Sequence, residues 1–433
     1  MKISFYIPNE KFQNVDCRKV EYGNPGIGGT WHMFLIVSSQ LARRDNGIGV
    51  TVFVQVKNDN LPAGPDYQLA NDPIEAIRLS DNASFDYIII NSCMVNWDEV
   101  AQIPFKSKIQ LIPWCHNFIN KQSEYLNVFA ESDRIARVIN VSREQMDLYM
   151  DHPAYDKMDY IFNCVPYPDE ISDKITSMPF ACRDNIVTYV GSLVPAKCFH
   201  VLATIWSDIV KRVPNAQLYI IGSGKLYDEN AKLGKYNIAE ETYEKKFMTY
   251  LTDSKGCILP NVHFMGNMGI EKNDILLKTK VGVPNPTGLT ETFCISAVEM
   301  QQMGCAVTAM YAPGYLDTFV NGKLVNNKKA LSNSIVELLK STKPHVPYDE
   351  VMSITEKFFS VDNVVSDWES LFETKCRTWI HPVEPLRNNR YHLKSVKYFL
   401  RNKNKKLNLL KWIKNIEYYI WQYERIRRHI RNY

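Results

Sequence analysis

The sequence of 433 residues lacks any run of 18 or more apolar residues, which excludes a candidate membrane-spanning helix. Its first ten residues, MKISFYIPNE, lack the apolar core of a secretory signal peptide, so we expect a cytoplasmic protein. Ten cysteines are scattered without a CxxC pair or a Cys/His cluster at metal-ligand spacing. This pattern argues against zinc sites and a disulfide framework, and we expect reduced thiols that mostly pack as small buried hydrophobes.

An excess of positive charge is absent from most of the chain. Residues 386–433 hold 14 Lys and Arg against two acids, Glu417 and Glu424, a net charge of +12. The preceding 385 residues carry 37 basic and 45 acidic side chains, a net charge of −8. The acidic body argues against nucleic acid as a partner, whereas the basic tail favours contact with an anionic surface.

The length exceeds what one ordinary hydrophobic core supports, so two domains are expected. A polar stretch near residues 166–185 separates two series of short apolar segments, and we place the boundary there. The expected organisation is a first domain at 1–170, a second at 171–385 and a basic helical tail at 386–433.

Short apolar runs rich in Ile and Val recur in both halves, as is typical of strands that are buried on both faces of a parallel sheet. The expected strands are 2–8, 49–56, 85–92, 109–115, 137–142, 185–193, 216–224, 261–268, 280–286 and 304–313. Helices are expected after the glycine-rich turn within 23–44, at 200–214 and at 293–303. This order predicts an α/β protein in which two Rossmann-like parallel-sheet domains face each other across a cleft.

Ligands of such sheets bind at the carboxyl ends of the strands, where this chain places several glycine turns. GIGG (26–29) precedes the first helix, whose N-terminus offers free N–H groups to a phosphate. Lys197 lies between a strand and a helix, and GSG (222–224) ends another strand. Each feature alone also fits an ordinary loop, because most such lysines are solvated and GIGG is not a full dinucleotide fingerprint.

The stretch NPTGLTETFCISAVEMQQMG (285–304) carries Glu291 in a loop and Glu299 in the following helix. Two glutamates at this spacing also arise by chance as solvent-facing acids. The backbone amides of Thr292, Phe293 and Cys294 would form a further anion site at the helix start. Together with the other strand-end turns, these residues favour a diphosphate ligand with a polyhydroxylated attachment.

His116 follows the strand at 109–115 and could exchange a hydrogen bond with a substrate, with a pKa near neutrality. A loop histidine that bonds to the backbone is the alternative. The chain contains no Asp-x-Asp pair, so the usual carboxylate clamp for a metal-bound diphosphate is missing and we expect no metal or other cofactor. The charge of a departing diphosphate would then be met by Lys197 and helix dipoles.

These motifs resemble those of the retaining glycosyltransferases of family 4, which have the GT-B fold. The resemblance covers most of residues 1–380 and is strongest over 187–321, where Glu291 and Glu299 match the E-x7-E signature. The first half agrees more loosely, in the GIGG turn, His116, VINVS (138–142) and FNCVP (162–166).

The resemblance implies roles for the donor-binding residues. Gly28 and Gly29 would approach the diphosphate of a nucleotide sugar, and Lys197 would bind it. Ser192 and Gly222 are assigned to the same donor site. Three departures from the family pattern bear on donor identity: Ser192 replaces a common arginine, ETFC (291–294) replaces Glu-Gly-Phe-Gly, and HNF (116–118) replaces His-Asp.

The resemblance also implies how the reaction proceeds. Glu299 would hold the ribose hydroxyls, Glu291 would lie near the hydroxyls of the donor sugar, and His116 would lie beside the anomeric carbon. The amides of Thr292 to Cys294 would help to hold the departing phosphate. The anomeric configuration would be retained by front-face attack without a metal, so that catalysis is mainly positioning and leaving-group stabilisation.

The tail segment NLLKWIKNIEYYIWQYERIRRHI (408–430) predicts an amphipathic helix. Its apolar side chains recur at steps of three or four: Leu409, Ile413, Ile416, Ile420, Tyr423, Ile426 and Ile430. Such a basic helix can lie on an anionic membrane. It can equally pack onto the protein's own body or pair with a second copy.

The sequence therefore predicts a retaining, hexosyltransferase-like glycosyltransferase that acts on a glycan or a lipid-linked acceptor, in surface polysaccharide synthesis at the inner face of the cell membrane. Two alternatives remain open. One is an enzyme of the same fold that modifies nucleotide sugars, and the other is a non-catalytic protein that binds polyanions through its tail.

Overall fold

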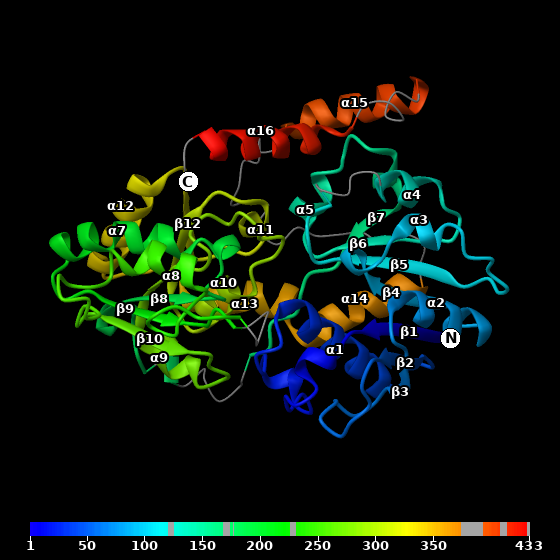
Figure 1. Cartoon of the computed structure of the whole chain (residues 1–433), viewed down its shortest axis with the longest axis horizontal. Coiled ribbons are helices and arrows are strands. Elements are labelled where there is room, and N and C mark those ends of the chain that lie inside the picture. Colours follow the sequence, from blue (N-terminus) through cyan, green and yellow to red (C-terminus); the bar gives the residue numbers. More distant parts are fainter. Residues whose placement is uncertain are drawn as a thin grey trace. The chain divides into compact units, whose positions relative to one another are not determined.

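The computed structural model describes residues 1–119, 125–167, 174–175, 177–225, 231–373, 393–407 and 414–430. The chain divides into two compact units (Figure 1). The first unit comprises Met1–Asn14, Phe34–Phe162 and Val365–Tyr433, and the second comprises Val15–Met33 and Asn163–Val364. Each unit contains one parallel sheet flanked by helices, so the predicted α/β fold with two Rossmann-like domains is confirmed.

The first unit has a seven-stranded parallel sheet in the order β3-β2-β1-β4-β5-β6-β7. Its strands are β1 (Lys2–Ile7), β2 (Gly49–Val54), β3 (Asp66–Leu69), β4 (Tyr87–Asn91), β5 (Gln110–Cys115), β6 (Val138–Asn140) and β7 (Met158–Tyr160). Five of them match predicted segments, whereas β3 and β7 are additional. The sequence does not reveal these two because β3 is a largely exposed, polar edge strand and β7 is only three residues long.

Helices pack against this sheet through large aromatic side chains. The helices that contribute to the first unit, apart from the tail, are α1 (Gly29–Arg43), α2 (Pro73–Asn82), α3 (Trp97–Val100), α4 (Tyr125–Glu131), α5 (Arg143–Asp147) and α14 (Val361–Glu373). On β5, the ring of Trp114 stacks at 4.6 Å on Phe34 of α1 and meets Trp368 of α14 edge-on at 4.7 Å. These buried rings join both helices to the centre of the sheet.

The second unit has a six-stranded parallel sheet in the order β10-β9-β8-β11-β12-β13. Its strands are β8 (Asp184–Val190), β9 (Gln217–Ile221), β10 (Val262–Gly266), β11 (Thr279–Gly282), β12 (Ala306–Met310) and β13 (Gly322–Val325). The strand order reverses between β8 and β11, which pair directly through Val187 and Val281. Loops that leave such a switch point diverge and open a crevice for a ligand.

The helices of the second unit cover this sheet and orient the loops at its carboxyl edge. They are α7 (Phe199–Arg212), α8 (Glu241–Met248), α9 (Lys272–Lys278), α10 (Ile295–Gln302), α11 (Pro313–Leu316), α12 (Lys328–Lys340) and α13 (Tyr348–Phe359). Helix α7 buries an apolar face that includes Leu202 and Trp206, both without exposed surface. The predicted helices at 200–214 and 293–303 correspond to α7 and α10.

The tail contributes two helices, α15 (Lys394–Leu407) and α16 (Ile416–Ile430), to the first unit. The predicted helix at 408–430 therefore begins later than expected, and its residues Leu409, Trp412 and Ile413 lie outside the described residues. The fully buried Lys397 forms an ion pair with Glu417 at 2.5 Å, which joins the two helices. None of the helices in the described ranges is long and apolar enough to span a bilayer.

The tail also bonds to the body of the first unit. Lys394 forms ion pairs of 2.9 Å with Glu144 and 2.7 Å with Asp147. The side chain of Asp151 accepts a hydrogen bond from the backbone N–H of Ile416. Part of the tail's positive charge is therefore used to attach the tail to the sheet domain.

The nine cysteines within the described ranges are free thiols. Most of them are buried, whereas Cys182 and Cys257 are exposed. The remaining cysteine, Cys376, lies outside the described residues.

Candidate functional site

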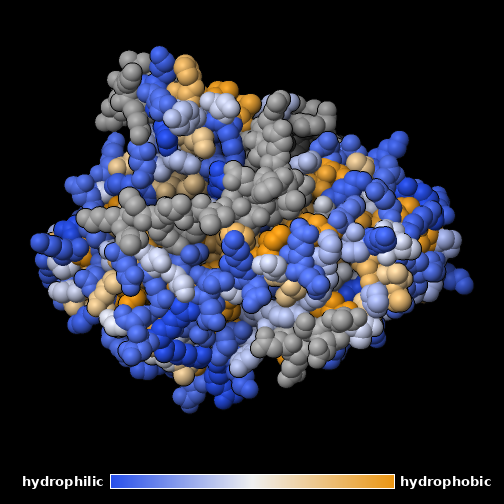
Figure 2. Space-filling view, turned by 180° about the vertical axis from the view of Figure 1, so that it is seen from behind, coloured by the Kyte–Doolittle hydropathy of each residue, from blue (hydrophilic) through white to orange (hydrophobic). Residues whose placement is uncertain are grey.

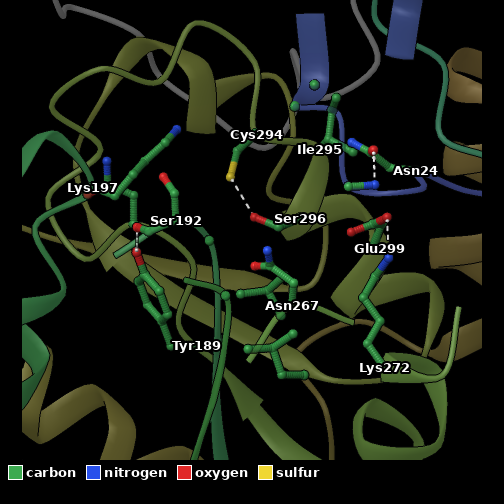
Figure 3. A pocket seen from close by; sticks show the side chains of 18 of the residues that line it. Asn24, Tyr189, Ser192, Lys197, Asn267, Lys272, Cys294, Ile295, Ser296 and Glu299 are labelled. Carbon is green, nitrogen blue, oxygen red and sulfur yellow. Dashed lines mark hydrogen bonds and ion pairs between the residues drawn. The ribbon is translucent and has the colours of Figure 1, made fainter. Parts of the chain in front are cut away.

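A pocket of about 1030 Å³, counting its open mouth, lies within the second unit at the carboxyl ends of its strands. Its wall comes from the loop at 24–29, from the turns after β8, β9 and β10, and from the segment at 285–299. Side chains from these separate segments point into one space (Figure 3). The glycine turn at 26–29 was predicted as part of the first domain, but it clusters with the second unit.

Close backbone packing shapes one side of the pocket. Gly222 directly follows β9 with φ +140°, and a Cβ atom at this position would overlap the carbonyl oxygen of Gly191 after β8. Only glycine fits there, because any side chain would push the two strand-end turns apart. A Cβ on Gly29 would approach Cδ1 of Ile295 to 3.2 Å, so the glycine turn also lies close to the start of α10.

Two helices begin at this pocket. Helix α10 starts at Ile295, and its N-cap residue Cys294 forms no capping hydrogen bond through its side chain. Helix α1 starts at Gly29, after Gly28 with φ +77°. The partial positive charge of a helix N-terminus favours an anionic group at both places, and α10 also offers N–H groups that the side chain of Cys294 does not cap.

Ser192 presents a buried hydroxyl to the pocket. The residue is 1% exposed and lines the pocket, but its Oγ has no hydrogen-bond partner among the described residues. Its backbone carbonyl accepts a hydrogen bond of 3.0 Å from Tyr189, which fixes the turn (Figure 3). A buried polar group without a partner is costly, so this hydroxyl indicates a ligand atom or water in the pocket.

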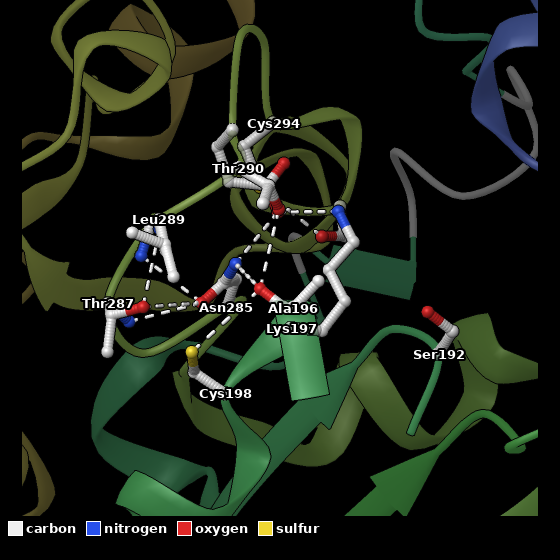
Figure 4. A network of polar contacts seen from close by, with 12 residues as sticks. Ser192, Ala196, Lys197, Cys198, Asn285, Thr287, Leu289, Thr290 and Cys294 are labelled. Carbon is white, nitrogen blue, oxygen red and sulfur yellow. Dashed lines mark hydrogen bonds and ion pairs between the residues drawn. The ribbon is translucent and has the colours of Figure 1, made fainter. Parts of the chain in front are cut away.

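Lys197 and Glu291 form one of two ion pairs in the pocket. Figure 4 shows Lys197 and Asn285 in the network of polar contacts around this pair. Nζ of Lys197 lies 2.6 Å from Oε1 of Glu291, and the side chains are 23% and 8% exposed. Asn285 donates a second hydrogen bond of 3.2 Å to the same carboxylate oxygen. The backbone carbonyl of Asn285 in turn accepts a hydrogen bond from buried Tyr315. Glu291 is thus held in one orientation by Lys197 and Asn285, and Tyr315 in turn fixes the backbone of Asn285.

The second ion pair joins Lys272 at the start of α9 to Glu299 in α10. The distance between Nζ and Oε1 is 3.1 Å, and the side chains are 8% and 17% exposed. Figure 3 shows this pair beside Asn267, on the opposite side of the drawn pocket from Lys197. The pocket therefore holds two carboxylates, each paired with a lysine.

Cys294 also lines the pocket, but it is poorly suited to act as a nucleophile. Burial and, to a smaller extent, the charge of Glu291 raise the pKa of its thiol to about 12. Its Sγ lies 3.5 Å from Oγ of Ser296, as drawn in Figure 3. The thiol is neutral at ordinary pH, so it contributes shape and a weak hydrogen bond.

The structure brings most of the predicted site residues together. Those that line this one pocket are Gly28, Gly29, Ser192, Lys197, Gly222, Glu291, Phe293, Cys294 and Glu299. Thr292 is buried next to them and does not itself line the pocket. His116 belongs to the first unit.

The environment of His116 differs from the expected one. The side chain is 7% exposed and packs against Trp114 at 4.6 Å and Phe34 at 5.7 Å between ring centroids. Burial lowers its pKa to about 3. The prediction of a pKa near neutrality is therefore wrong, and the imidazole is neutral at physiological pH because its surroundings disfavour the charged form.

The polar residues of the pocket that were missed from the sequence include Asn24, Asn267, Lys272 and Asn285. Asn24 had a readable signal, since Asn-Pro-Gly is a turn pattern and its Oδ1 accepts hydrogen bonds from the N–H groups of Gly26 and Ile27. The other three residues have no local signature, because their role depends on partners distant in the sequence. Within the described ranges, no three His, Cys, Asp or Glu side chains gather as a metal site would require.

One protein-family model matches the part of the chain that forms most of this pocket. Residues 172–350 match the family model described as Glycosyl transferases group 1. This range contains the lining residues of the pocket except those of the loop at 24–29. A comparison with curated protein sequences gave no significant match.

Solved structures share the fold of almost the whole chain. Anabaena HepE in complex with UDP and glucose has a TM-score of 0.59 at 14% identity, with 86% of this chain and 99% of HepE covered. A glycosyltransferase from Rickettsia africae has a TM-score of 0.57 at 13% identity, with 90% and 99% covered. AviGT4, a glycosyltransferase of avilamycin A biosynthesis, has a TM-score of 0.51 at 12% identity, with 86% and 97% covered. The chain has the predicted GT-B fold.

Proposed function

We propose that this protein is a glycosyltransferase that binds a nucleoside diphosphate sugar in the pocket of the second unit. The observation that carries the proposal is the convergence on one pocket of two helix N-termini, Lys197 and the unpartnered hydroxyl of Ser192. All four features suit a diphosphate. The match of residues 172–350 to group 1 glycosyltransferases supports the same conclusion.

In this proposal the diphosphate lies at the start of α10. The backbone amides of Thr292 to Cys294 and the turn at Gly28 and Gly29 hold its oxygens. Lys197 supplies a cation, and the hydroxyl of Ser192 donates a hydrogen bond where related enzymes commonly have an arginine. The loss of that arginine is partly offset, because the hydroxyl is already buried and needs no desolvation on binding.

Glu299 binds the hydroxyls of the ribose, and Glu291 binds hydroxyls of the donor sugar. The fixed orientation of Glu291 supports this role, because a preorganised carboxylate loses little entropy when it accepts a hydrogen bond from the sugar. The matching spacing of these two residues, E-x7-E, supports assignment to the family 4 retaining enzymes. His116 is proposed to lie beside the anomeric carbon, where its neutral imidazole offers a hydrogen bond and no charge.

The proposed reaction retains the anomeric configuration and uses no metal ion. The acceptor hydroxyl oxygen forms a bond to the anomeric carbon on the face from which the diphosphate departs. The bond from this carbon to the diphosphate oxygen breaks with its electron pair, and the acceptor proton passes to the departing diphosphate. The protein contributes positioning and stabilisation of the leaving group, chiefly through Lys197 and the start of α10.

The acceptor is proposed to be a glycan or a lipid-linked saccharide of a surface polysaccharide, approached at the inner face of the membrane. The tail supports this location, because several large apolar side chains of α15 and α16 are exposed: Val396, Tyr398, Phe399, Leu400, Tyr419, Tyr423 and Ile426. Exposed Lys403 and Arg425 lie among them. Figure 2 shows orange apolar residues interleaved with blue hydrophilic ones over the face that it presents.

Exposed aromatic and basic side chains on one pair of helices are typical of a surface that lies in the headgroup region of an anionic membrane. Each basic residue near such a surface adds about 1 kcal/mol to binding. The contacts between the tail and the body are compatible with membrane binding. Lys394 bonds to Glu144 of the body and Lys397 bonds to Glu417 of the tail, while other side chains of α15 and α16 stay exposed.

The experiment that tests the function is sugar transfer with purified protein. UDP-, GDP- and ADP-sugars are supplied with and without membrane lipid extracts from a polysaccharide-producing bacterium, in the presence and absence of EDTA. We expect acceptor-dependent release of one nucleoside diphosphate, unaffected by EDTA. Conversion of a nucleotide sugar without an acceptor would instead indicate a sugar-modifying enzyme. Binding of the tail to polyanions without any nucleotide binding would indicate a non-catalytic protein.

A further inference from the structure

The Lys272–Glu299 pair is a feature that the sequence motifs do not contain. Lys272 is the first residue of α9, and its ammonium reaches Glu299 on α10 at 3.1 Å. Both side chains line the pocket and are mostly buried, at 8% and 17% exposure (Figure 3). A lysine is seldom buried to this extent without a functional or structural partner.

The chemistry of the pair indicates what kind of group it faces. The ammonium of Lys272 has three donor protons and forms an ion pair with Oε1 of Glu299 at 3.1 Å. The pair therefore offers a ligand further donor protons on Lys272 and the second carboxylate oxygen of Glu299 as an acceptor. The pair has no net charge, so it attracts a phosphate less than an uncapped helix N-terminus does. A neutral group that both donates and accepts hydrogen bonds fits it better, and a vicinal diol is such a group.

Resting on the donor-binding function proposed above, we infer that Lys272 is a specificity-determining residue for the ribose of the donor. Its ammonium donates to a ribose hydroxyl oxygen, while the Glu299 carboxylate accepts the hydroxyl protons. A 2′-deoxyribose leaves part of this buried pair without a partner, and sites built for a hydroxyl reject ligands that lack it for this reason. The pocket therefore selects ribonucleotides through a lysine as well as a carboxylate.

Titration calorimetry with matched ligands tests this inference. The ligands are UDP, GDP and ADP, each compared with its 2′-deoxy counterpart. The variants are Lys272→Met, which removes the charge at similar volume, and Lys272→Arg, which keeps the charge. Lys278→Met is the matched control, because Lys278 is an exposed lysine on the same helix.

We expect the wild-type protein to bind one ribonucleotide at least about tenfold more tightly than its deoxy form. Lys272→Met should reduce this preference by about tenfold. The affinity for the ribonucleotide should fall more than the affinity for the deoxy form, since one hydrogen bond to a charged group is lost. Lys272→Arg should keep part of the preference, and Lys278→Met should keep all of it.

An equal loss of affinity for both forms in Lys272→Met would overturn the inference, because it indicates a general electrostatic role. Equal wild-type affinity for ribo and deoxy forms would overturn it as well, and this result does not depend on any variant being folded. If no nucleotide binds the wild-type protein, the proposed function fails and the inference fails with it. Nucleotide binding with an unchanged ribose preference in the folded variant overturns the inference alone.

Discussion

The ammonium of Lys197 lies 2.6 Å from a carboxylate oxygen of Glu291, although the two residues are 94 positions apart in the sequence. The contact crosses the switch point of the second sheet, since Lys197 follows β8 and Glu291 follows β11. In the proposed donor complex this lysine lies where the diphosphate and the sugar meet. The pair therefore links the cation for the leaving group to the carboxylate that orients the sugar.

Replacement of Lys197 by Met should reduce kcat by about 10²-fold or more, because the charge that develops on the leaving diphosphate loses a preorganised cation. The variant should be less stable than the wild-type protein, because buried Glu291 loses its cation and keeps the hydrogen bond from Asn285. Steady-state transfer kinetics and circular dichroism measure the two effects. Lys211→Met, at an exposed position of α7, is the control. Wild-type turnover in Lys197→Met would refute the assigned role.

Replacement of Ser192 by Ala should separate ligand binding from stability. The hydroxyl has no partner in the described part of the chain, so its removal breaks no internal hydrogen bond and should leave the melting temperature unchanged or slightly raised. Affinity for the nucleoside diphosphate should fall by about 1 kcal/mol, or roughly fivefold. Thermal unfolding and calorimetry of the same sample make the comparison, with Ser254→Ala at an exposed site as control. Unchanged affinity would exclude a contact between this hydroxyl and the ligand.

Membrane attachment through the tail should depend on its exposed apolar side chains. A triple variant with Phe399, Tyr423 and Ile426 changed to Ser should lose most binding to vesicles that contain anionic lipid, since several kcal/mol of apolar burial are lost. Folding should be preserved, because all three side chains are more than half exposed in the wild-type protein. Vesicle co-sedimentation at low and high salt measures the effect. Tyr250→Ser, at an exposed site on the second unit, is the control and should bind vesicles as the wild-type protein does. Undiminished sedimentation of the triple variant with vesicles would disprove attachment through these side chains.

Burial of His116 should make stability depend on pH. Its pKa is lowered to about 3 in the folded protein, against about 6.5 in the unfolded chain. Between these values the unfolded chain binds the additional proton, so this contribution is complete above about pH 6.5 and is lost as the pH falls toward 3. Between pH 7.5 and pH 5.5 the loss should be about 1 kcal/mol for this one group.

The variant His116→Leu has no imidazole at this position, so its folding stability should fall by about 1 kcal/mol less than that of the wild-type protein between pH 7.5 and pH 5.5. Urea unfolding of both proteins at pH 7.5 and pH 5.5 provides the measurement. His345→Gln, at an exposed position, should behave like the wild-type protein and serves as control. An identical loss of stability in His116→Leu and in the wild-type protein would show that another buried histidine is responsible.

The strands were readable from the sequence wherever they were long, apolar and central. The run FDYIIINS predicts β4 because a strand buried on both faces requires continuous apolar residues, and the structure buries its isoleucines completely. Edge strand β3 (Asp66–Leu69) escaped prediction because one side of an edge strand faces solvent and tolerates polar side chains. The C-terminal helix was predicted at 408–430, and the structure has it at Ile416–Ile430. The sequence pattern also does not show that Lys397 of α15 is buried against Glu417 of α16.

Candidate site residues were predictable where they belong to a local pattern. Gly222 follows β9 and allows close backbone approach to Gly191, and Gly28 precedes α1 in a glycine-rich turn. Glu291 and Glu299 share the E-x7-E spacing of a glycosyltransferase family that the sequence resembles. Lys272 carries no such mark, because a single lysine at the start of a helix usually faces solvent. Its burial depends on the packing of α9 against the sheet, which the sequence does not display.

By itself the sequence determined the alternation of strands and helices, the glycine turns at strand ends and the opposite charges of body and tail. These properties are local, since they depend on neighbouring residues and on composition. Only the tertiary structure decided which charges meet: Lys197 with Glu291, Lys272 with Glu299 and Lys397 with Glu417. Ion pairs form over a few ångströms of space, and the strand order brings Lys197 and Glu291, 94 positions apart, within this range. The other two pairs depend on how α9 lies beside α10 and α15 beside α16, which is also a property of the folded chain.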